Sequence, residues 1–526
     1  MDLCEKSKLI EMIDKADVIS FDVFDTLLFR KVNTPETIFD LIGNHFDIHG
    51  FRKLRIDEQN RASRIAYQKT KAPHADMNEI YDALSEHSEI DVDWQKVKEF
   101  EIQAEKDALT ANREMLEIFR YAKNQKKRVV ATSDMYLLAA TLGEILESCG
   151  YNGFDHIYCS ADEHKAKFSK DLFECVAEKE NTAYENILHI GDSQSADVDI
   201  PSSFGIKTFR YHCDADMEKV KDTACTDIDN GMYKILFDKN KGFWYNLGIE
   251  AGGPLYMGLY NWLSKKYPDK GQKIYFLSRD GCNLCKLFRD MGYTNVQYIY
   301  TSRRALLLAG IDEINDEAIA ELPPYTMGQS VGDILDYLCI PRDKITQLSK
   351  AGFESMDDII RSVDDKAAFK KLYVLEKEIF LERCAEERRN AEKYFREVGL
   401  ADEKEAVVFD CGWSGSSQVL LDRFLSCIGS ECKTFFCYFG IRNTEKSRKQ
   451  LHKKHYDTYA FDFYSNHSLQ SGVNEAVVLY ELFFSAPHES VYYYGDNGVV
   501  FENGEGDKEK SDILEGIIDY VKAAAD

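Results

Sequence analysis

Short apolar runs alternate with longer charged stretches over much of the chain. Four such runs end at Phe21, Ala131, Cys159 and Ile190, and their lengths are typical of buried strands. The stretches between them have the spacing of amphipathic helices. This alternation predicts an α/β fold in which parallel strands are joined by right-handed crossovers.

One charged stretch, residues 32–108, is too long for a single crossover. Its pattern is helical throughout, and Thr34-Pro35-Glu36-Thr37 is typical of a capped helix start. We therefore expect a helical insertion between the first and second strands.

A second strand and helix pattern follows a polar, irregular stretch. The stretch at 214–245 predicts a linker, so the expected domains are 1–213 and 246–526. In the later domain a helix over 247–265 is interrupted by Gly252-Gly253-Pro254. The remaining predicted elements are strands over 273–277, 296–300 and 406–409, helices within 312–400, a hairpin over 491–501 and a final helix over 513–525.

Charge and length exclude several classes of protein. A chain of 526 residues with a net charge of −25 lacks the basic footprint that nucleic acid or an anionic membrane attracts. No segment resembles a signal peptide or a membrane helix, so we expect a cytoplasmic protein without integral membrane association. The 14 cysteines are scattered, which predicts reduced thiols, and Cys282-x-x-Cys285 is best explained by helix packing.

Polar residues follow the strand ends in a fixed order along the chain. They are Asp22-Val23-Phe24-Asp25-Thr26, then Ser133-Asp134, then Lys167, and finally Gly191-Asp192 with Asp197. A carboxylate at a strand end can be phosphorylated or alkylated and then hydrolysed. Two later acids can bind a divalent cation, while a lysine and a hydroxyl hold an anionic group. Each piece alone is common at turns and helix caps, but their order together favours an enzyme.

This order resembles the haloacid dehalogenase (HAD) superfamily of hydrolases over residues 15–212. The resemblance implies a Rossmann-like core, a helical cap at 32–108 and a Mg²⁺ cofactor. It implies the following roles: Asp22 as nucleophile, Thr26 as positioning hydroxyl, Ser133 as phosphoryl ligand, Lys167 as charge stabiliser, and Asp22, Asp192, Asp197 and the Phe24 carbonyl at the metal. Thr132 competes with Ser133, and Lys165 and Lys170 compete with Lys167, for these roles. Residues 21–30, with Thr132-Ser133-Asp134-Met135-Tyr136, resemble one bacterial branch that is often associated with surface-polysaccharide gene clusters.

Phe24 departs from the phosphatase pattern of this superfamily. Phosphatases usually carry a second aspartate there, which protonates the leaving oxygen and then activates water. Without it, the leaving group departs unaided, Asp25 substitutes as the acid and contacts the substrate, or the site has become a binding site. Dehalogenases also accept an aromatic residue at this position, but they need no cation, whereas Asp192 and Asp197 predict one.

Three strand ends of the later domain carry a second set of candidates. Arg279 and Asp280 follow one predicted strand, Arg303 and Arg304 follow the next, and Asp410 opens a loop that contains Ser414 and Gly415. Arginines and a glycine-rich loop before a helix can bind an anion or a nucleotide sugar. The arrangement faintly resembles phosphoribosyltransferases, although Cys411 follows Asp410 where that family has an acidic doublet.

Two classes of function stay open at this stage. The first is a Mg²⁺-dependent hydrolase or phosphotransferase that acts on a small phosphorylated metabolite, such as a precursor of a surface glycan. The second is a binding or regulatory module that keeps the HAD fold but turns over poorly, or a transferase whose activity resides in the later domain. The oligomeric state is open as well.

Overall fold

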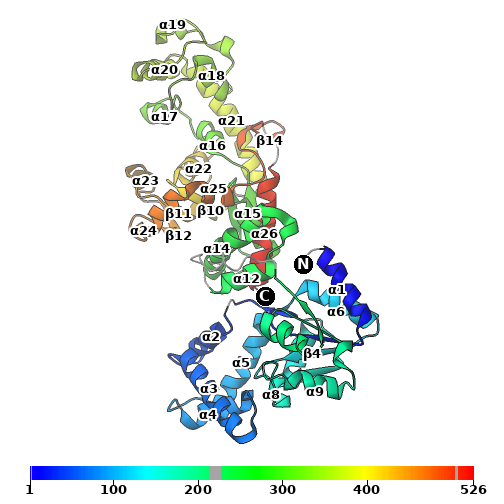
Figure 1. Ribbon diagram of the computed structural model, residues 1–526. Coiled ribbons are helices and arrows are strands. Elements are labelled where there is room, and N and C mark those ends of the chain that lie inside the picture. Colours follow the sequence, from blue (N-terminus) through cyan, green and yellow to red (C-terminus); the bar gives the residue numbers. More distant parts are fainter. Residues whose placement is uncertain (2, 33, 214–226, 504–506, 526) are drawn as a thin grey trace. The chain divides into compact units, whose positions relative to one another are not determined.

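A parallel sheet in the order β5-β4-β1-β6-β7 forms the centre of the N-terminal part of the chain. The computed structural model describes residues 1, 3–32, 34–213, 227–503 and 507–525. The chain divides into two compact units, which we call the first unit (Met1–Glu250 with Ala523–Asp526) and the second unit (Ala251–Lys522). Both are α/β, as the sequence predicts (Figure 1).

The five strands of the first sheet include the four that the apolar runs predict. They are β1 (Val18–Phe21), β4 (Arg128–Ser133), β5 (His156–Cys159), β6 (Ile187–Gly191) and β7 (Lys207–Arg210). In register, Phe21 lies beside Ala131 on one side and Ile190 on the other. The polar residues that follow these strands therefore meet at one edge of the sheet.

Alternate residues of the strands pack on opposite faces of this sheet. Val129 and Ala131 join a core with helices α1 (Leu3–Lys15), α6 (Arg113–Asn124) and α7 (Ala139–Ser148). Val130 joins a smaller core on the other face with helix α9 (Asp171–Lys179). Burial on both faces explains why these strands are almost continuously apolar.

The helical insertion lies between β1 and β4. It starts and ends with an antiparallel pair, β2 (Leu28–Arg30) and β3 (Leu109–Ala111), and contains α2 (Thr37–His45), α3 (Phe51–Thr70), α4 (Met77–His87) and α5 (Trp94–Ala108). A buried ion pair joins two of these helices, because Arg55 Nη2 lies 2.7 Å from Glu101 Oε1. Helix α2 begins at Thr37, within the predicted start at 34–37. Thr34 Oγ1 lies 2.9 Å from Thr37 Oγ1, while the N-cap residue Glu36 makes no side-chain cap hydrogen bond.

The predicted linker is partly helical. Its first part, residues 214–226, lies outside the described residues. After it, α12 (Asp227–Leu236) and α13 (Gly242–Leu247) form where the sequence indicated irregular chain. Helix α12 packs against β2 in the first unit.

The second unit has its own parallel sheet, in the order β12-β11-β10-β8-β9. Its strands are β8 (Ile274–Leu277), β9 (Val296–Ile299), β10 (Glu405–Trp413), β11 (Lys433–Ile441) and β12 (Tyr456–Phe461). The sequence placed Asp410 in a loop, but β10 continues to Trp413. Gly412 pairs with Gly440 there, and a Cβ on Gly412 would lie 2.5 Å from the Gly440 carbonyl oxygen, so glycine permits this close pairing.

Helices surround this second sheet and extend from it. The longer ones are α14 (Gly253–Lys266), α15 (Cys282–Asp290), α20 (Val363–Leu375), α21 (Lys377–Glu397), α22 (Ser416–Cys427), α24 (His467–Glu475), α25 (Val477–Phe484) and α26 (Lys508–Ala525). Shorter ones are α16 (Arg303–Ala309), α17 (Asp316–Glu321), α18 (Val331–Tyr337), α19 (Leu348–Ala351) and α23 (Glu445–Gln450). The predicted hairpin is present as β13 (Val491–Gly495) and β14 (Gly498–Phe501).

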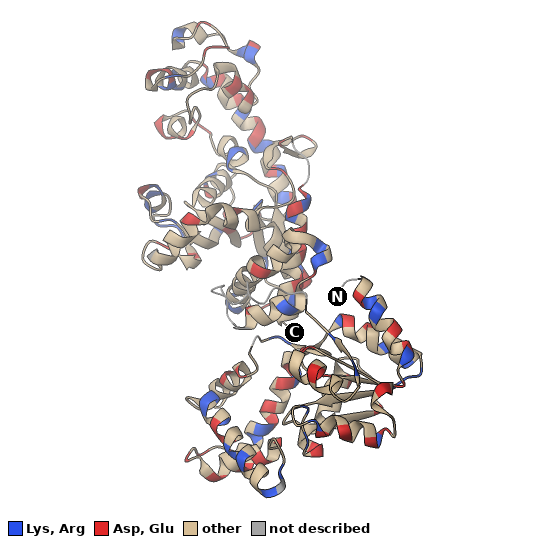
Figure 2. Cartoon of the chain, in the orientation of Figure 1, with Lys and Arg blue, Asp and Glu red and all other residues tan. Residues whose placement is uncertain are grey.

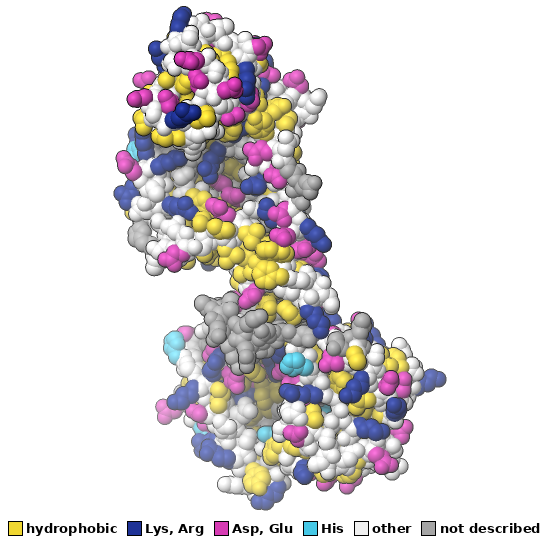
Figure 3. All heavy atoms as spheres, turned by 45° about the horizontal axis from the view of Figure 1, so that its top comes forward, with side chains coloured by type: hydrophobic (Ala, Val, Ile, Leu, Met, Phe, Trp, Pro, Cys, Tyr) yellow, Lys and Arg dark blue, Asp and Glu magenta, His cyan; other side chains and the backbone are white. Residues whose placement is uncertain are grey.

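Acidic and basic residues are interspersed along the helices of both units (Figure 2). On the described part of the face shown in Figure 3, neither sign of charge forms one continuous patch. Within the described ranges, no helix combines the length and the apolar character that a membrane span requires. The described cysteines are all free thiols.

Candidate active site

Asp22 is the first residue after β1, and its position is fixed by the sheet. Its backbone N–H donates to the Ile190 carbonyl oxygen of β6 at 2.8 Å, and its side chain is almost fully buried. Burial raises the pKa of Asp22 to about 6, although the charge of Lys167 acts in the opposite direction.

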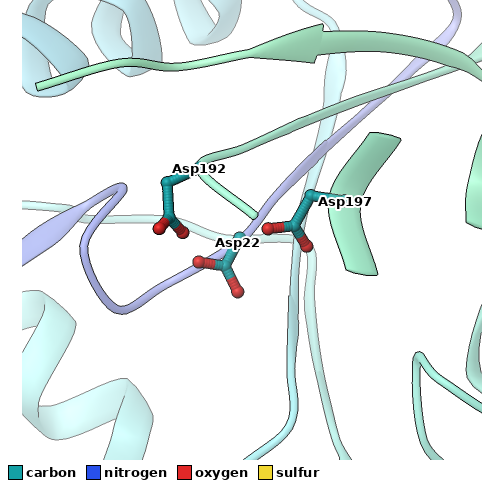
Figure 4. A group of neighbouring side chains, drawn as sticks. All are labelled: Asp22, Asp192 and Asp197. Atoms are coloured by element: carbon teal, nitrogen blue, oxygen red, sulfur yellow. The ribbon is translucent and has the colours of Figure 1, made fainter. Parts of the chain in front are cut away.

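Two further carboxylates approach Asp22 from the segment after β6 (Figure 4). Asp192 follows the strand directly, and Asp197 lies in the short helical turn Gln194–Asp199. One carboxylate oxygen of each of the three aspartates lies within 4.8 Å of the others. Gly191 makes this possible, because a Cβ at that position would lie 2.4 Å from Asp197 Cγ. The glycine before Asp192 is thus a steric requirement of the cluster.

Lys167 provides the positive charge of the cluster. Its ammonium donates to Asp22 Oδ1 at 2.6 Å and to Asp197 Oδ1 at 2.7 Å, and the side chain is buried. Its backbone N–H also donates to the carboxylate of Asp134. Three carboxylates around one ammonium leave an excess of negative charge, which a divalent cation would neutralise.

A buried chain of polar side chains supports Asp197 from inside the sheet. His189 Nε2 lies 3.1 Å from Asp197 Oδ1, His189 Nδ1 lies 2.8 Å from Ser20 Oγ, and Ser20 Oγ lies 2.8 Å from Thr132 Oγ1. Because a carboxylate only accepts, a neutral His189 donates from Nε2 and accepts at Nδ1 from Ser20. Thr132 then donates to Ser20. Burial would raise the pKa of Asp197, but the hydrogen bond from His189 and the charge of Lys167 lower it overall.

We did not predict this buried chain of polar side chains from the sequence, although the sequence contains a signal for it. Ser20 and His189 are directly opposite each other in register on β1 and β6, where apolar residues otherwise predominate. Polar residues in two buried strands predict a hydrogen bond between them. The chain also separates the two candidate hydroxyls, because Thr132 bonds within the sheet while Ser133 is the last residue of β4.

Thr26 contacts the acidic cluster at Asp192. Its hydroxyl donates to Asp192 Oδ1 at 3.4 Å, and its carbonyl oxygen accepts from Asn112 Nδ2 at 2.7 Å. Asn112 also caps α6, so the loop that carries Thr26 is tied to the return of the chain from the helical insertion.

Phe24 and Asp25 have different surroundings. The Phe24 ring lies 4.3 Å from the Arg30 guanidinium carbon, in a cation–π contact. Asp25 adopts a left-handed backbone conformation with φ 59°, which aspartate tolerates better than most residues. Its carboxylate, 45% exposed, accepts a hydrogen bond from the Lys234 ammonium of α12. Lys234 was not predicted, because nothing in its local sequence distinguishes it from a surface lysine.

The second unit gathers four of the seven residues that the sequence analysis proposed there. Arg279, Asp280, Arg303 and Asp410 line one cavity of about 150 Å³ at the ends of β8, β9 and β10, together with Ser278 and Ser417.

Ser414 and Gly415 are absent from the lining of this cavity. Gly415 has φ 77° and precedes α22, where a Cβ would lie 2.5 Å from Leu451 Cδ2, which accounts for the glycine. Ser414 Oγ lies 2.8 Å from Ser416 Oγ. Arg304, the neighbour of Arg303, is buried and donates to the carbonyl oxygens of Tyr337 and Tyr492.

Comparisons with known proteins agree with the geometry of the first unit. Residues 16–205 match the family model for hydrolases of the haloacid dehalogenase-like kind. The first unit therefore contains a HAD-like hydrolase domain. The comparison with curated proteins gave no match.

Solved structures with similarity to this chain include three HAD proteins. The magnesium-bound HAD-hydrolase YfnB from Bacillus subtilis has 18% identity and a TM-score of 0.27, with 38% of this chain and 89% of YfnB covered. L-2-haloacid dehalogenase from Xanthobacter autotrophicus has 15% identity and a TM-score of 0.30, with 43% and 91% covered. The HAD family enzyme BT-2542 from Bacteroides thetaiotaomicron, in complex with magnesium and phosphate, has 15% identity and a TM-score of 0.30, with 38% and 96% covered.

Proposed function

We propose that the first unit is a Mg²⁺-dependent phosphohydrolase that forms an aspartyl phosphate on Asp22. The observation that supports this proposal is the cluster of Asp22, Asp192 and Asp197, in which the ammonium of Lys167 bonds to Asp22 and Asp197 but not to Asp192. A dehalogenase needs a nucleophile but no cation, so the excess of carboxylates favours phosphoryl transfer.

Each residue of the cluster has its own role in the proposed reaction. Asp22 attacks the phosphorus atom, the substrate oxygen leaves, and water later hydrolyses the aspartyl phosphate and regenerates Asp22. Lys167 and Ser133 donate hydrogen bonds to the phosphoryl oxygens, and Thr26 orients the loop beside Asp192. Asp22, Asp192 and the Phe24 carbonyl are the proposed Mg²⁺ ligands, with Asp197 directly or through water. Bound there, Mg²⁺ supplies positive charge to the transferring phosphoryl group.

The loop after β1 is poorly equipped to protonate the leaving group. Phe24 has no acidic proton to donate to the leaving group, and Asp25, the neighbouring carboxylate, is bonded to Lys234. We therefore propose substrates whose leaving group departs without strong protonation, such as acyl or other activated phosphates. Phe24, together with the bond between Asp25 and Lys234, also supports a second candidate, a HAD-fold binding module with slow turnover.

The metabolic context of the substrate is proposed from sequence resemblance alone. Residues 21–30 resemble a bacterial branch that is associated with surface-polysaccharide genes, so we propose a small phosphorylated metabolite of surface-glycan synthesis. A panel of sugar phosphates and activated phosphates, assayed with and without Mg²⁺, tests this choice.

The nucleophile is tested by trapping with fluoroberyllate. We expect Mg²⁺-dependent formation of a complex in which the trapped group is bound to Asp22, and loss of both complex and turnover in Asp22→Asn. Asp82→Asn, on an exposed position of α4, is the matched control and should behave like the unaltered chain. Equal trapping by Asp22→Asn would contradict the assignment.

A further inference from the structure

The cavity of the second unit lies where the strand order of its sheet reverses. From β8 the chain moves outward to β9, and it then returns to β10 on the other side of β8 and continues to β11 and β12. Connections that leave adjacent strands in opposite directions open a crevice at the carboxyl ends of the strands, where α/β sheets bind their ligands. Asp280 follows β8 and Asp410 lies in β10, so these two acids mark the two sides of the crevice.

Two arginines at this crevice make no hydrogen bond or ion pair with the described residues, although their charges act on Asp280. Arg279 is partly buried and Arg303 is exposed, and both line the cavity. Within the described ranges of the chain, neither guanidinium takes part in a hydrogen bond or an ion pair. Arg304, by contrast, is held by two carbonyl oxygens and by Glu387. Two unpaired guanidinium groups beside one cavity form a site for a phosphate, which guanidinium groups bind bidentately.

The two carboxyl groups add a second kind of recognition. Burial and the neighbouring charge of Asp410 raise the pKa of Asp280 to about 7, and burial raises the pKa of Asp410 to about 6. At neutral pH the pair therefore contains both a hydrogen-bond donor and an acceptor. A hydroxyl group, which also donates and accepts, is the matching ligand group, and Ser278 and Ser417 provide further hydroxyl partners in the lining.

The size of the cavity limits the ligand. About 150 Å³ is half or less of the volume of a pocket for a drug-sized molecule, roughly 300–1,000 Å³. A nucleotide sugar is too large to be enclosed, whereas a phosphorylated monosaccharide or smaller polyol is of a suitable size.

We propose that this cavity binds a sugar phosphate, with Arg279 and Arg303 at the phosphate and Asp280 and Asp410 at the hydroxyl groups. This site is separate from the acidic cluster of the first unit, because its residues belong to a different sheet. It gives the protein a second ligand site whose occupancy does not depend on phosphoryl transfer.

Hydrogen–deuterium exchange of the full chain tests the site directly. The probes are glucose 1-phosphate, fructose 6-phosphate, glycerol 3-phosphate, inorganic phosphate and glucose, all with EDTA so that no divalent cation loads the first unit. We expect at least one phosphorylated polyol to protect residues 278–281, 301–303 and 410–417. Inorganic phosphate should protect them less, and glucose should not protect them.

A matched pair of arginine variants then tests the mechanism of binding. Arg279→Ala should weaken the affinity for the protecting probe by about tenfold or more, because a charge-assisted hydrogen bond is lost. Arg389→Ala, at an exposed position of α21, should leave the affinity unchanged. Arg279→Lys retains the charge and serves as a second variant if Arg279→Ala does not fold.

Three results would overturn the proposal. They are the absence of protection in these segments with every phosphorylated probe, an unchanged affinity in a folded Arg279→Ala, and protection by inorganic phosphate as strong as that by the phosphorylated polyols.

Discussion

The two sheets place acidic side chains at the same topological position but surround them differently. In each, carboxylates lie within or shortly after two adjacent strands from which the chain departs in opposite directions: β1 and β6 in the first sheet, β8 and β10 in the second. In the first, Lys167 bonds directly to two of the carboxylates. In the second, the neighbouring arginines bond to none. Topology thus positions the acids in both sheets, and the basic partner distinguishes the proposed cation site of the first sheet from the proposed anion site of the second.

The difference extends to the residues behind the carboxylates. Asp197 is held by Lys167, by His189 and by the backbone N–H of Ser193 at 3.0 Å, so its orientation is fixed before any ligand arrives. Fixed groups are what a reacting site requires, because reorganisation during the reaction is costly.

Replacement of Lys167 is the strongest test of the first site. Lys167→Ala should lower kcat by about 10²–10³-fold, because the ammonium no longer stabilises charge on the transferring phosphoryl group. Lys165→Ala, which changes a neighbouring lysine outside the cluster, should leave kcat unchanged. Steady-state kinetics with an activated phosphate measures both, and an equal loss in the two variants would show that Lys167 has no special role.

The Phe24→Asp variant tests whether the missing general acid is what limits turnover at the first site. Hydrolysis of alkyl phosphates should rise by up to about 10²-fold, while aryl and acyl phosphates should change little, because only alkoxide leaving groups need a proton. The ratio of the two rates is the measurement. If the ratio is unchanged and Asp25→Asn abolishes alkyl-phosphate hydrolysis in a folded chain, then Asp25 is the acid that works.

The Mg²⁺ affinity of single variants measures how much each carboxylate contributes to cation binding. Asp192→Asn should weaken Mg²⁺ binding by about 10–100-fold, and Asp197→Asn by less, because Asp197 is already engaged by three protein donors. Calorimetric titration with Mg²⁺ measures both, with Asp82→Asn as the control. Absence of Mg²⁺ binding by the unaltered chain would remove the proposed phosphoryl-transfer chemistry.

The pH dependence of stability tests the raised pKa of Asp280 in the second site. The pKa of Asp280 rises to about 7 on folding, whereas an unfolded aspartate has a pKa near 4. The stability that this carboxyl contributes is therefore complete below about pH 4 and is lost as the pH rises to about 7. Asp280→Asn should raise the unfolding temperature at pH 8 by roughly 2–4 °C for each kcal/mol regained, with a smaller rise at pH 5. Scanning calorimetry at the two pH values measures this, and an equal shift at both would contradict it.

The sequence predicted the fold of the first sheet well, for a physical reason. Buried parallel strands are short apolar runs, and an aspartate directly after such a run is visible in the chain, as at Asp22 and Asp192. The strand ends at Phe21, Cys159 and Ile190 were predicted within one residue of their positions. The HAD-like domain follows from the same residues.

The parts that were missed depend on contacts over long distances. Lys234 lies 209 residues from Asp25, and His189 carries no motif of its own. In the second unit, Asp410 and Gly412 are turn-forming residues that ended the predicted strand early. Their extended pairing depends on Gly440 in the next strand, a contact that local periodicity does not contain.

The bond between Lys234 and Asp25 connects the loop after β1 to a helix that lies beyond the family match. The family match stops at residue 205, and the last strand of the sheet stops at Arg210. A chain cut at that point would keep all the recognisable motifs, yet Asp25 would lose its only cation among the described residues. The loop after β1 is thus held by a helix that lies beyond the family match, so the proposed active site depends on more of the chain than that match covers.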